Sequence, residues 1–165
     1  MQPLRRQVWA PVGQTPVRYP WDRHDRLTVI CALTVAPWEQ RFGLYYDLLD
    51  HNCHAVDLMR FLQLVHLRLR RTMLLVWDRL SAHRSAAAQL ERAGRSWLQP
   101  RWLPSYAPEL DPVEFVWTHS KYDDLANWIP EDLDDLRRHV VLLLDEYRRD
   151  PARLCSFFRI ARLPI

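Results

Sequence analysis

Residues 73–77 (MLLVW) form an unbroken apolar run that ends at Asp78. A short run of this kind predicts a strand buried on both faces, because a strand with one exposed face alternates apolar and polar residues. Such a strand needs other layers of structure packed on both of its faces. The run therefore favours an α/β layer fold. With 165 residues, 48% of them hydrophobic, the chain is long enough for one domain with a substantial core, spanning residues 1–165.

The patterns on either side of this run predict the other layers. Before it, the spacing of apolar residues predicts two antiparallel strands and a helix, at 27–36, 44–49 and from Asn52 to about Arg71. After it, capping and spacing predict a helix, a strand and two helices, at 81–93, 97–103, Asp111 to about Asn127, and 131–147. The proline-rich residues 1–26 are expected to form a loop, and the tail from Pro151 stays unassigned. We expect a mixed sheet flanked by helices, with its core at about 27–127 and C-terminal helices within about 131–165.

Several classes of chemistry lack the residues that they need. The chain has only three glycines and no glycine-rich phosphate-binding loop or dinucleotide fingerprint. Its three cysteines include no C-x-x-C pair, and the cluster of His51, Cys53 and His54 lacks a fourth ligand for structural zinc. We expect that cluster to mark a turn and the start of a helix. No apolar stretch approaches the roughly 20 residues of a membrane span, so we expect a cytoplasmic protein with no membrane partner.

The basic residues are almost all arginine. Of 23 Lys and Arg residues, Lys121 is the only lysine, and the net charge is +3. The planar guanidinium group suits phosphate oxygens, although genomic base composition explains a high arginine content equally well. The charge by itself leaves both explanations open.

Two acids, Asp78 and Glu114, are candidate metal ligands. Asp78 follows the buried run, and Glu114 opens a helix after a proline-rich turn, so both lie where a buried scaffold meets solvent. Mg²⁺ takes oxygen ligands, and two such ions about 4 Å apart can serve phosphodiester chemistry. Lys121 lies seven positions after Glu114, on the same face of the expected helix, where it can meet a phosphate or pair with an acid.

A structural interpretation of the same residues stays open. Asp111 can cap the helix, and Glu114 can reach back to a free backbone N–H in a capping box. Asp78 can cap a turn, and His83 can be a half-buried histidine bonded to a backbone carbonyl. Spacing alone does not choose between capping and metal binding.

Two motifs resemble those of a known family. The segments LLVWDRLSAHRS (74–85) and WLPSYAPELDPVEFVWTHSK (102–121) resemble the catalytic core of DDE-superfamily transposases of the mariner-like and bacterial insertion-sequence group. That group has strand-Asp-x-x-x-x-His and Leu-Pro-x-Tyr-x-Pro-x-x-Asn-Pro-x-Glu-x-x-Trp patterns. The segment WAPVGQTPV (9–17) resembles the family's sequence just after its first catalytic strand. The resemblance covers nearly the whole chain and implies a ribonuclease H-like fold.

The resemblance assigns roles to individual residues. It implies that Asp78 and Glu114 are the second and third catalytic acids, which bind Mg²⁺ or Mn²⁺, with two ions in an intact site, during DNA cleavage and strand transfer. His83, Arg79 and Lys121 are candidate contacts to DNA. The implied partners are transposon-end and target DNA, together with a second copy of the chain or a full-length transposase. The implied location is the bacterial cytoplasm, on the nucleoid when DNA is bound.

The chain also departs from the family pattern. Arg79 and Asp111 stand where the family usually has Asn, and Arg79 can either grip a phosphate or lower the occupancy of a metal ion. No acid occurs in residues 1–21, and neither Asp22 nor Asp25 is placed as the first catalytic acid would be. We therefore expect a truncated catalytic domain that lacks its first, central strand and the family's N-terminal DNA-reading region, and that is inactive alone.

Two alternatives remain. One is a non-catalytic module in which arginines hold DNA or a partner transposase and the acids only cap helices. The other is an unrelated metal-dependent phosphohydrolase, which would need acids beyond those of the site, and the sequence offers only Asp111 and Asp22 for that purpose.

Overall fold

The computed structural model describes residues 11–12, 27–36, 38 and 41–163. Most of the N-terminal loop expected at 1–26, including Asp22 and Asp25, lies outside these residues, as does nearly all of the WAPVGQTPV segment. Within the described residues, none of the helices has both the length and the apolar character that crossing a membrane requires.

The first two strands form an antiparallel pair, as predicted. Strand β1 (Thr28–Ala36) pairs with β2 (Arg41–Leu49), and the register places Thr28 opposite Leu49 and Thr34 opposite Gly43. A Cβ on Gly43 would lie 2.7 Å from Oγ1 of Thr34, which explains the absence of a side chain there. Strand β2 begins three residues before the predicted 44–49 because the ladder with β1 continues to Arg41.

The middle of the chain folds as two helices and two parallel strands. These elements are α1 (Ala55–Leu69), β3 (Met73–Trp77), α2 (Ser81–Arg92) and β4 (Leu98–Trp102). Strands β3 and β4 pair in parallel, with Met73 opposite Leu98. Because they run in the same direction, both strands begin at one edge of their sheet and end at the other. Both α1 and α2 therefore end at the edge where the strands begin.

The start of α1 differs in detail from the prediction. The helix is capped at His54 instead of Asn52, and the backbone N–H of His54 donates to Oδ2 of Asp57 at 2.9 Å. Nε2 of His51 lies 3.1 Å from the same carboxylate oxygen. The cluster of His51, Cys53 and His54 thus marks a turn and a helix start, as expected.

The C-terminal part is helical. A 3-10 turn (Pro108–Leu110) leads into α3 (Pro112–His119), a π-helical turn (Ser120–Asp124), α4 (Leu133–Arg148) and α5 (Pro151–Ile160). The helix predicted to reach Asn127 ends at Asp124, and the unassigned tail forms α5. Asp150 caps α5 through a hydrogen bond of 3.0 Å from the backbone N–H of Arg153, and Pro151 occupies its first position.

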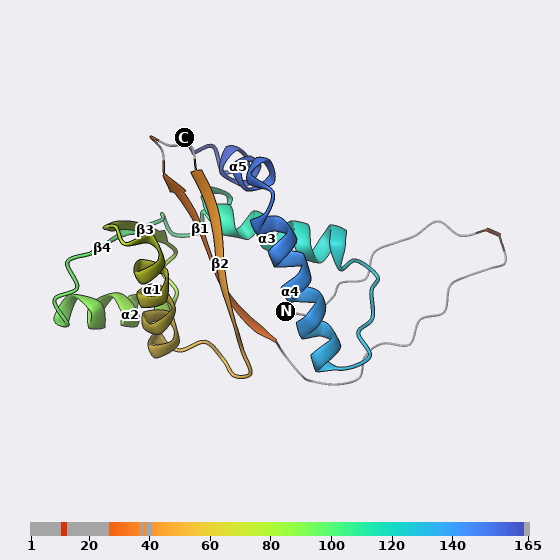
Figure 1. Ribbon diagram of the computed structural model, residues 1–165, viewed down its shortest axis with the longest axis horizontal. Coiled ribbons are helices and arrows are strands. Elements are labelled where there is room, and N and C mark those ends of the chain that lie inside the picture. Colours follow the sequence, from red (N-terminus) through yellow and green to blue (C-terminus); the bar gives the residue numbers. More distant parts are fainter. Residues whose placement is uncertain (1–10, 13–26, 37, 39–40, 164–165) are drawn as a thin grey trace.

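Both faces of the β1–β2 pair are covered (Figure 1). On one face, Cys31 and Leu44 pack with α3, α4 and α5. On the other, Ile30 and Leu49 pack with α1, α2 and Trp77 of β3. Successive residues of β1 contribute to opposite faces, as the two-residue period of a strand requires. The β1–β2 pair is therefore the middle layer of an α/β structure with one hydrophobic cluster on each side.

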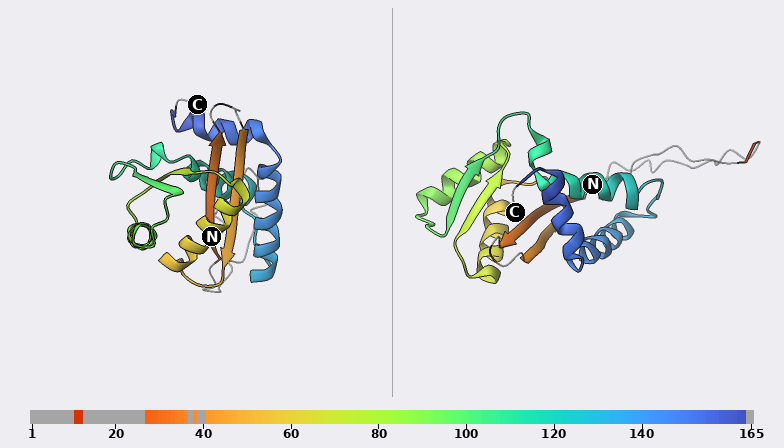
Figure 2. Two further views of the ribbon diagram at one scale, coloured as in Figure 1. Left: turned by 60° about the vertical axis from the view of Figure 1, so that its left-hand side comes forward. Right: turned by 90° about the horizontal axis from the view of Figure 1, so that it is seen from above.

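The strands of the described residues form two separate two-stranded sheets, β1–β2 and β3–β4, visible as two pairs of arrows in Figure 2. No described strand joins β1 to β3. The mixed α/β fold predicted from the sequence, with helices flanking the strands, agrees with this arrangement.

Candidate functional site

Asp78 lies at the carboxyl end of β3. The backbone N–H of Leu103 donates to the carbonyl of Trp77 at 2.9 Å, which joins the end of β3 to the end of β4. Oδ1 of Asp78 accepts hydrogen bonds from the backbone N–H of Leu80 at 3.0 Å and from Nδ1 of His83 at 2.5 Å. The side chain nevertheless stays 56% exposed. Because both hydrogen bonds use Oδ1, Oδ2 can serve as a ligand.

His83 is held by a column of stacked rings. Its ring stacks on Trp77 with centroids 4.7 Å apart, and Trp77 stacks in turn on Trp102 at 5.6 Å. Trp77 is buried, and its Nε1 has no hydrogen-bond partner in the described part of the chain. The column fixes the orientation of the imidazole, so His83 presents Nδ1 to Asp78. His83 is thus a partner of Asp78, which the structural interpretation of a histidine bonded to a backbone carbonyl did not anticipate.

The ring column could not be assigned from the sequence, although a signal for it exists. Trp77 and Trp102 are the last residues of β3 and β4, and the parallel register places them side by side. Recognising this requires the pairing of two strands that are separated by a helix.

Arg79 is directed partly toward the backbone. Its Nε donates to the carbonyl oxygen of Leu103 at 3.4 Å. This contact anchors the guanidinium group next to the end of β4, close in the chain to Asp78. The side chain remains exposed, so contact with a phosphate is compatible with its position.

The helix that carries Glu114 is capped by Asp111. Oδ1 of Asp111 accepts a hydrogen bond of 3.0 Å from the backbone N–H of Val113, and Pro112 occupies the first helical position. Glu114 is exposed in the first turn of α3. In the described part of the chain, its carboxylate forms no capping hydrogen bond, so the capping-box interpretation of Glu114 gains no support.

The carboxyl group of Asp111 interacts electrostatically with Asp78 and with Glu114, which come from different segments. Burial raises the pKa of Asp111 above its ordinary value, and the carboxylates of Glu114 and Asp78 raise it further. The hydrogen bond from Val113 and the proximity of His83 oppose this rise. Asp111 therefore lies within electrostatic range of residues from both segments. Asp78 and Glu114, 36 positions apart in the sequence, belong to one electronegative region.

The same region reaches strand β1. Burial raises the pKa of the Cys31 thiol, and the charge of Asp111 raises it further. Cys31 lies on the face of β1 that packs against α3. Asp111 thus lies beside the middle layer of the fold.

Lys121 lies in the π-helical turn and is half-buried. Its predicted position on the face of Glu114 assumed a regular α-helix, whose repeat of 3.6 residues a π turn interrupts. Among the described residues, Lys121 forms no ion pair with Glu114. Its proximity to the acids stays a prediction.

The donor set is small. Across residues 11–12, 27–36, 38 and 41–163, no group of three or more His, Cys, Asp or Glu side chains is close enough together to hold a metal ion. Asp78 and Glu114 are exposed carboxylates, the ligand type that Mg²⁺ and Mn²⁺ prefer. Mg²⁺ commonly binds proteins through one or two carboxylates, with waters and substrate phosphates completing its coordination. The two residues fit that chemistry.

The layered fold, with two small sheets flanked by helices, is of the ribonuclease H-like class. Residues 1–137 match the family model described as DDE superfamily endonuclease, and the chain belongs to that family. The family membership predicted from the two motifs is confirmed. Members of this superfamily generally use divalent metal ions.

A solved structure with the same fold is a chain of the crystal structure of the Mos1 Strand Transfer Complex. The two share 19% sequence identity with a TM-score of 0.58, and the match covers 97% of this chain. It covers 46% of the other chain, so this chain spans less than half the length of its structural relative. No curated protein matches the sequence.

Proposed function

We propose that this chain forms part of a DDE transposase catalytic domain that acts on phosphodiester bonds of DNA, with Asp78 and Glu114 as metal ligands. The observation that carries the proposal is the shared electronegative region. Two exposed acids from different segments both raise the pKa of the half-buried carboxyl of Asp111. Family membership supports the same assignment.

The proposed cofactor is Mg²⁺ or Mn²⁺, with two ions in an intact site. Held by Asp78 and Glu114, such ions would supply activation of the attacking oxygen and stabilisation of the leaving oxygen in phosphodiester cleavage. Asp78 would contribute Oδ2, since Oδ1 is engaged by His83 and Leu80. Glu114 would bind from the first turn of α3.

Three neighbouring side chains have supporting roles in this proposal. His83 positions the Asp78 carboxylate, because its ring is fixed by the stack on Trp77. Arg79 and Lys121 supply positive charge to DNA phosphates. The proposed partners are transposon-end and target DNA, with a second copy of the chain or a full-length transposase as the protein partner, in a bacterial cytoplasm.

We further propose that the chain is inactive by itself. A transposase site of this kind uses more acids than Asp78 and Glu114, and the described residues provide no group of three ligands. A segment supplying another acid beside β1 and β3 would complete the site. Joining the chain to a strand that ends in an acid, encoded upstream in any reading frame, should then give metal-dependent DNA nicking.

Metal binding can be tested on the chain as it exists. Mn²⁺ should broaden the NMR signals of the amides of Leu80 and Val113. The first amide donates to Asp78, and the second donates to Asp111, beside Glu114. Asp78→Ala and Glu114→Ala should each reduce the broadening at Val113. The control is Glu109→Ala, which removes an exposed acid five residues from Glu114 and should leave the broadening unchanged.

The same measurement separates the proposal from a non-catalytic DNA-binding module. Such a module predicts no selective broadening and no effect of Asp78→Ala. Equal broadening in the wild-type chain and in both site variants would show that these acids are not the metal ligands. In an intact form, nicking retained by either variant would overturn their catalytic role.

A further inference from the structure

A second surface of interest lies at the opposite edge of the β3–β4 sheet from Asp78. There the chain leaves α1 and enters β3, and leaves α2 and enters β4. The backbone N–H of Met73 donates to the carbonyl of Trp97 at 2.8 Å, which joins the two connections. The ring of His66 stacks on Trp97 with centroids 4.3 Å apart, and its Nδ1 lies 3.1 Å from the carbonyl oxygen of Arg71. The two connections thus form one fixed surface.

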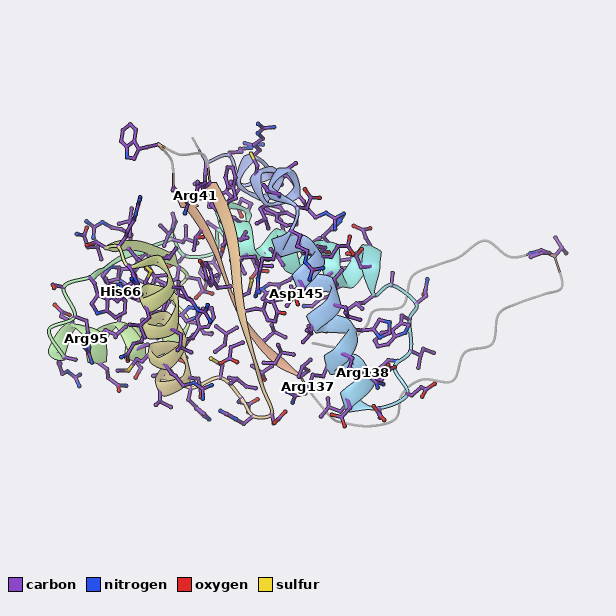
Figure 3. The ribbon with its side chains drawn as sticks, in the orientation of Figure 1. Arg41, His66, Arg95, Arg137, Arg138 and Asp145 are labelled. Carbon is purple, nitrogen blue, oxygen red and sulfur yellow. The ribbon has the colours of Figure 1, made fainter. Side chains whose placement is uncertain are left out.

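This surface concentrates positive charge. Residues 66–71 and 91–97 contain five arginines, all exposed, and Glu91 is the only acid among them. We refer to the five as the arginine surface: Arg68, Arg70, Arg71, Arg92 and Arg95. The labels of His66 and Arg95 in Figure 3 mark its position at one end of the molecule.

Four arginines of the arginine surface differ in ion pairing from five arginines elsewhere in the described chain. Several arginines elsewhere form ion pairs with acids: Arg60, Arg137, Arg138, Arg148 and Arg153. Among the described residues, no acid pairs with the guanidinium groups of Arg68, Arg70, Arg92 and Arg95. Their charge is therefore available to a partner from solution.

Neutralisation of helix ends explains only part of this charge. Arg68 and Arg92 lie in the last turns of α1 and α2, where a cation interacts favourably with the helix dipole. Arg70 and Arg95 lie beyond the helical residues. Arg70 is the C-cap of α1 with a φ of 52°, a left-handed conformation that Gly or Asn adopts more easily. Arginine therefore occupies this C-cap position although its backbone conformation favours Gly or Asn.

We propose that the arginine surface binds the phosphate backbone of DNA at a place distinct from Asp78 and Glu114. The inference rests on the proposed function in taking DNA as the polyanion. The exposed guanidinium groups of Arg68, Arg70, Arg92 and Arg95 suit phosphate oxygens, because each offers several donors in one plane. A fixed framework of two joined connections holds them together.

The length of β3 sets the spacing between this surface and the proposed catalytic acids. The five residues of β3 separate the arginine surface from Asp78, a distance of about 17 Å at roughly 3.3 Å per residue. This equals about five base pairs at roughly 3.4 Å each. A straight duplex that lies parallel to β3, with one phosphate at the proposed metal site of Asp78, would therefore contact the arginine surface about five base pairs further along. The surface would fix the direction of the duplex relative to the acids.

The test is the salt dependence of DNA binding by the 165-residue chain. Binding to a short mixed-sequence duplex is measured by fluorescence anisotropy in EDTA, from about 50 to about 200 mM salt. The test variant carries Arg70→Asn, Arg92→Gln and Arg95→Gln, where Asn suits the left-handed C-cap. Each phosphate that the variant no longer neutralises should reduce the steepness of log affinity against log salt by about 0.9. We therefore expect the slope to become shallower by about 2 to 3.

A matched control removes the same charge elsewhere. The control variant carries Arg138→Gln, Arg149→Gln and Arg159→Gln, three exposed arginines of α4 and α5 or the residue that follows α4. Arg138 lies well apart from His66 and Arg95 in Figure 3. We expect the control to keep the wild-type slope, and circular dichroism to show that both variants are folded.

Three results would overturn the proposal. The first is an unchanged slope in the test variant, including the case in which that variant melts earlier, because the arginines would then only stabilise helix ends. The second is an equally shallow slope in the control variant, which would indicate a response to net charge alone. The third is a wild-type chain that does not bind DNA at low salt. Because EDTA removes divalent metal ions, failure of the metal site proposed at Asp78 would leave this measurement unaffected.

Discussion

The hydrogen bond between Tyr147 and Asp124 links α4 to the turn that follows α3. Tyr147 is fully buried, and its hydroxyl donates to Oδ2 of Asp124 at the end of the π-helical turn. Burial, followed by the nearby Asp124 carboxylate, raises the pKa of the tyrosine, so it remains a donor over the usual assay range. Tyr147→Phe removes this hydroxyl and leaves the ring.

The expected loss of stability follows from the type of bond. A hydrogen bond to a charged group contributes about 1.5 to 3 kcal/mol, and the ring contacts with Phe157 and Arg153 are retained. For a domain of this size, about 2 to 4 °C in Tm corresponds to each kcal/mol. We expect Tyr147→Phe to lower Tm by about 3 to 12 °C in a calorimetric or circular dichroism melt.

The control is Tyr106→Phe, because Tyr106 is fully exposed and its substitution should cost less than about 0.5 kcal/mol. Asp124→Asn keeps an acceptor for the hydroxyl, so we expect it to cost less than Tyr147→Phe. A Tm for Tyr147→Phe equal to that of Tyr106→Phe would refute the idea that this bond holds the turn after α3 against α4.

Two further predictions concern the site and the core. Asp111→Asn keeps a good helix cap and removes a carboxylate whose folded pKa is raised, so urea unfolding should show the variant to be more stable than the wild type at neutral pH. Above its folded pKa, Asp111 ionises and destabilises the wild type. The stability advantage of Asp111→Asn should therefore vanish as the pH falls through that pKa to the unfolded value near 3.8. An advantage that grows at acid pH would contradict this reasoning. Leu144→Ala, at a site with 0% exposure, should cost about 2 to 5 kcal/mol by urea unfolding. Leu142→Ala, 68% exposed on the same helix, should cost less than about 0.5 kcal/mol, and equal losses would show that the core is assigned wrongly.

Most of the element order could be predicted because local patterns specify it. The run at 73–77 forms β3 with the predicted bounds, and the predicted helix at 81–93 agrees with α2 to within one residue. The exposed residues Leu74 and Val76 are an exception. The run predicted a strand buried on both faces, yet in the described residues the face of β3 that carries them is largely open. A continuous apolar run indicates that a strand can be buried, while the extent of burial depends on neighbours distant in sequence.

Other features depend on contacts that no local pattern contains. The helix that begins at Pro112 ends at Asp124 after a π-helical turn, where Asp124 meets Tyr147 from another helix. The tail became α5 because Leu154 and Phe157 join the cluster on β1 and β2. The Asp150–Pro151 pair was a usable signal for its start, since it combines an N-cap residue with proline at the first helical position.

The candidate site was predicted in part for the same reason. Asp78 and Glu114 were identified by their positions at a strand end and a helix start, which are local features. The contact of His83 with Asp78 spans the turn between β3 and α2, and its support by Trp77 and Trp102 requires the pairing of β3 with β4. Sequence reasoning could propose Asp78 and Glu114 as ligands, and it could not find the rings that orient His83 toward Asp78.

The two acids come from elements that pack into different hydrophobic clusters. Asp78 follows β3, which packs into the cluster with α1 and α2, whereas Glu114 lies on α3, which packs into the cluster with α4 and α5. The β1–β2 pair contributes to both clusters, but no described backbone ladder joins β1 to β3. The separation of the two carboxylates is therefore set by side-chain packing across the middle layer.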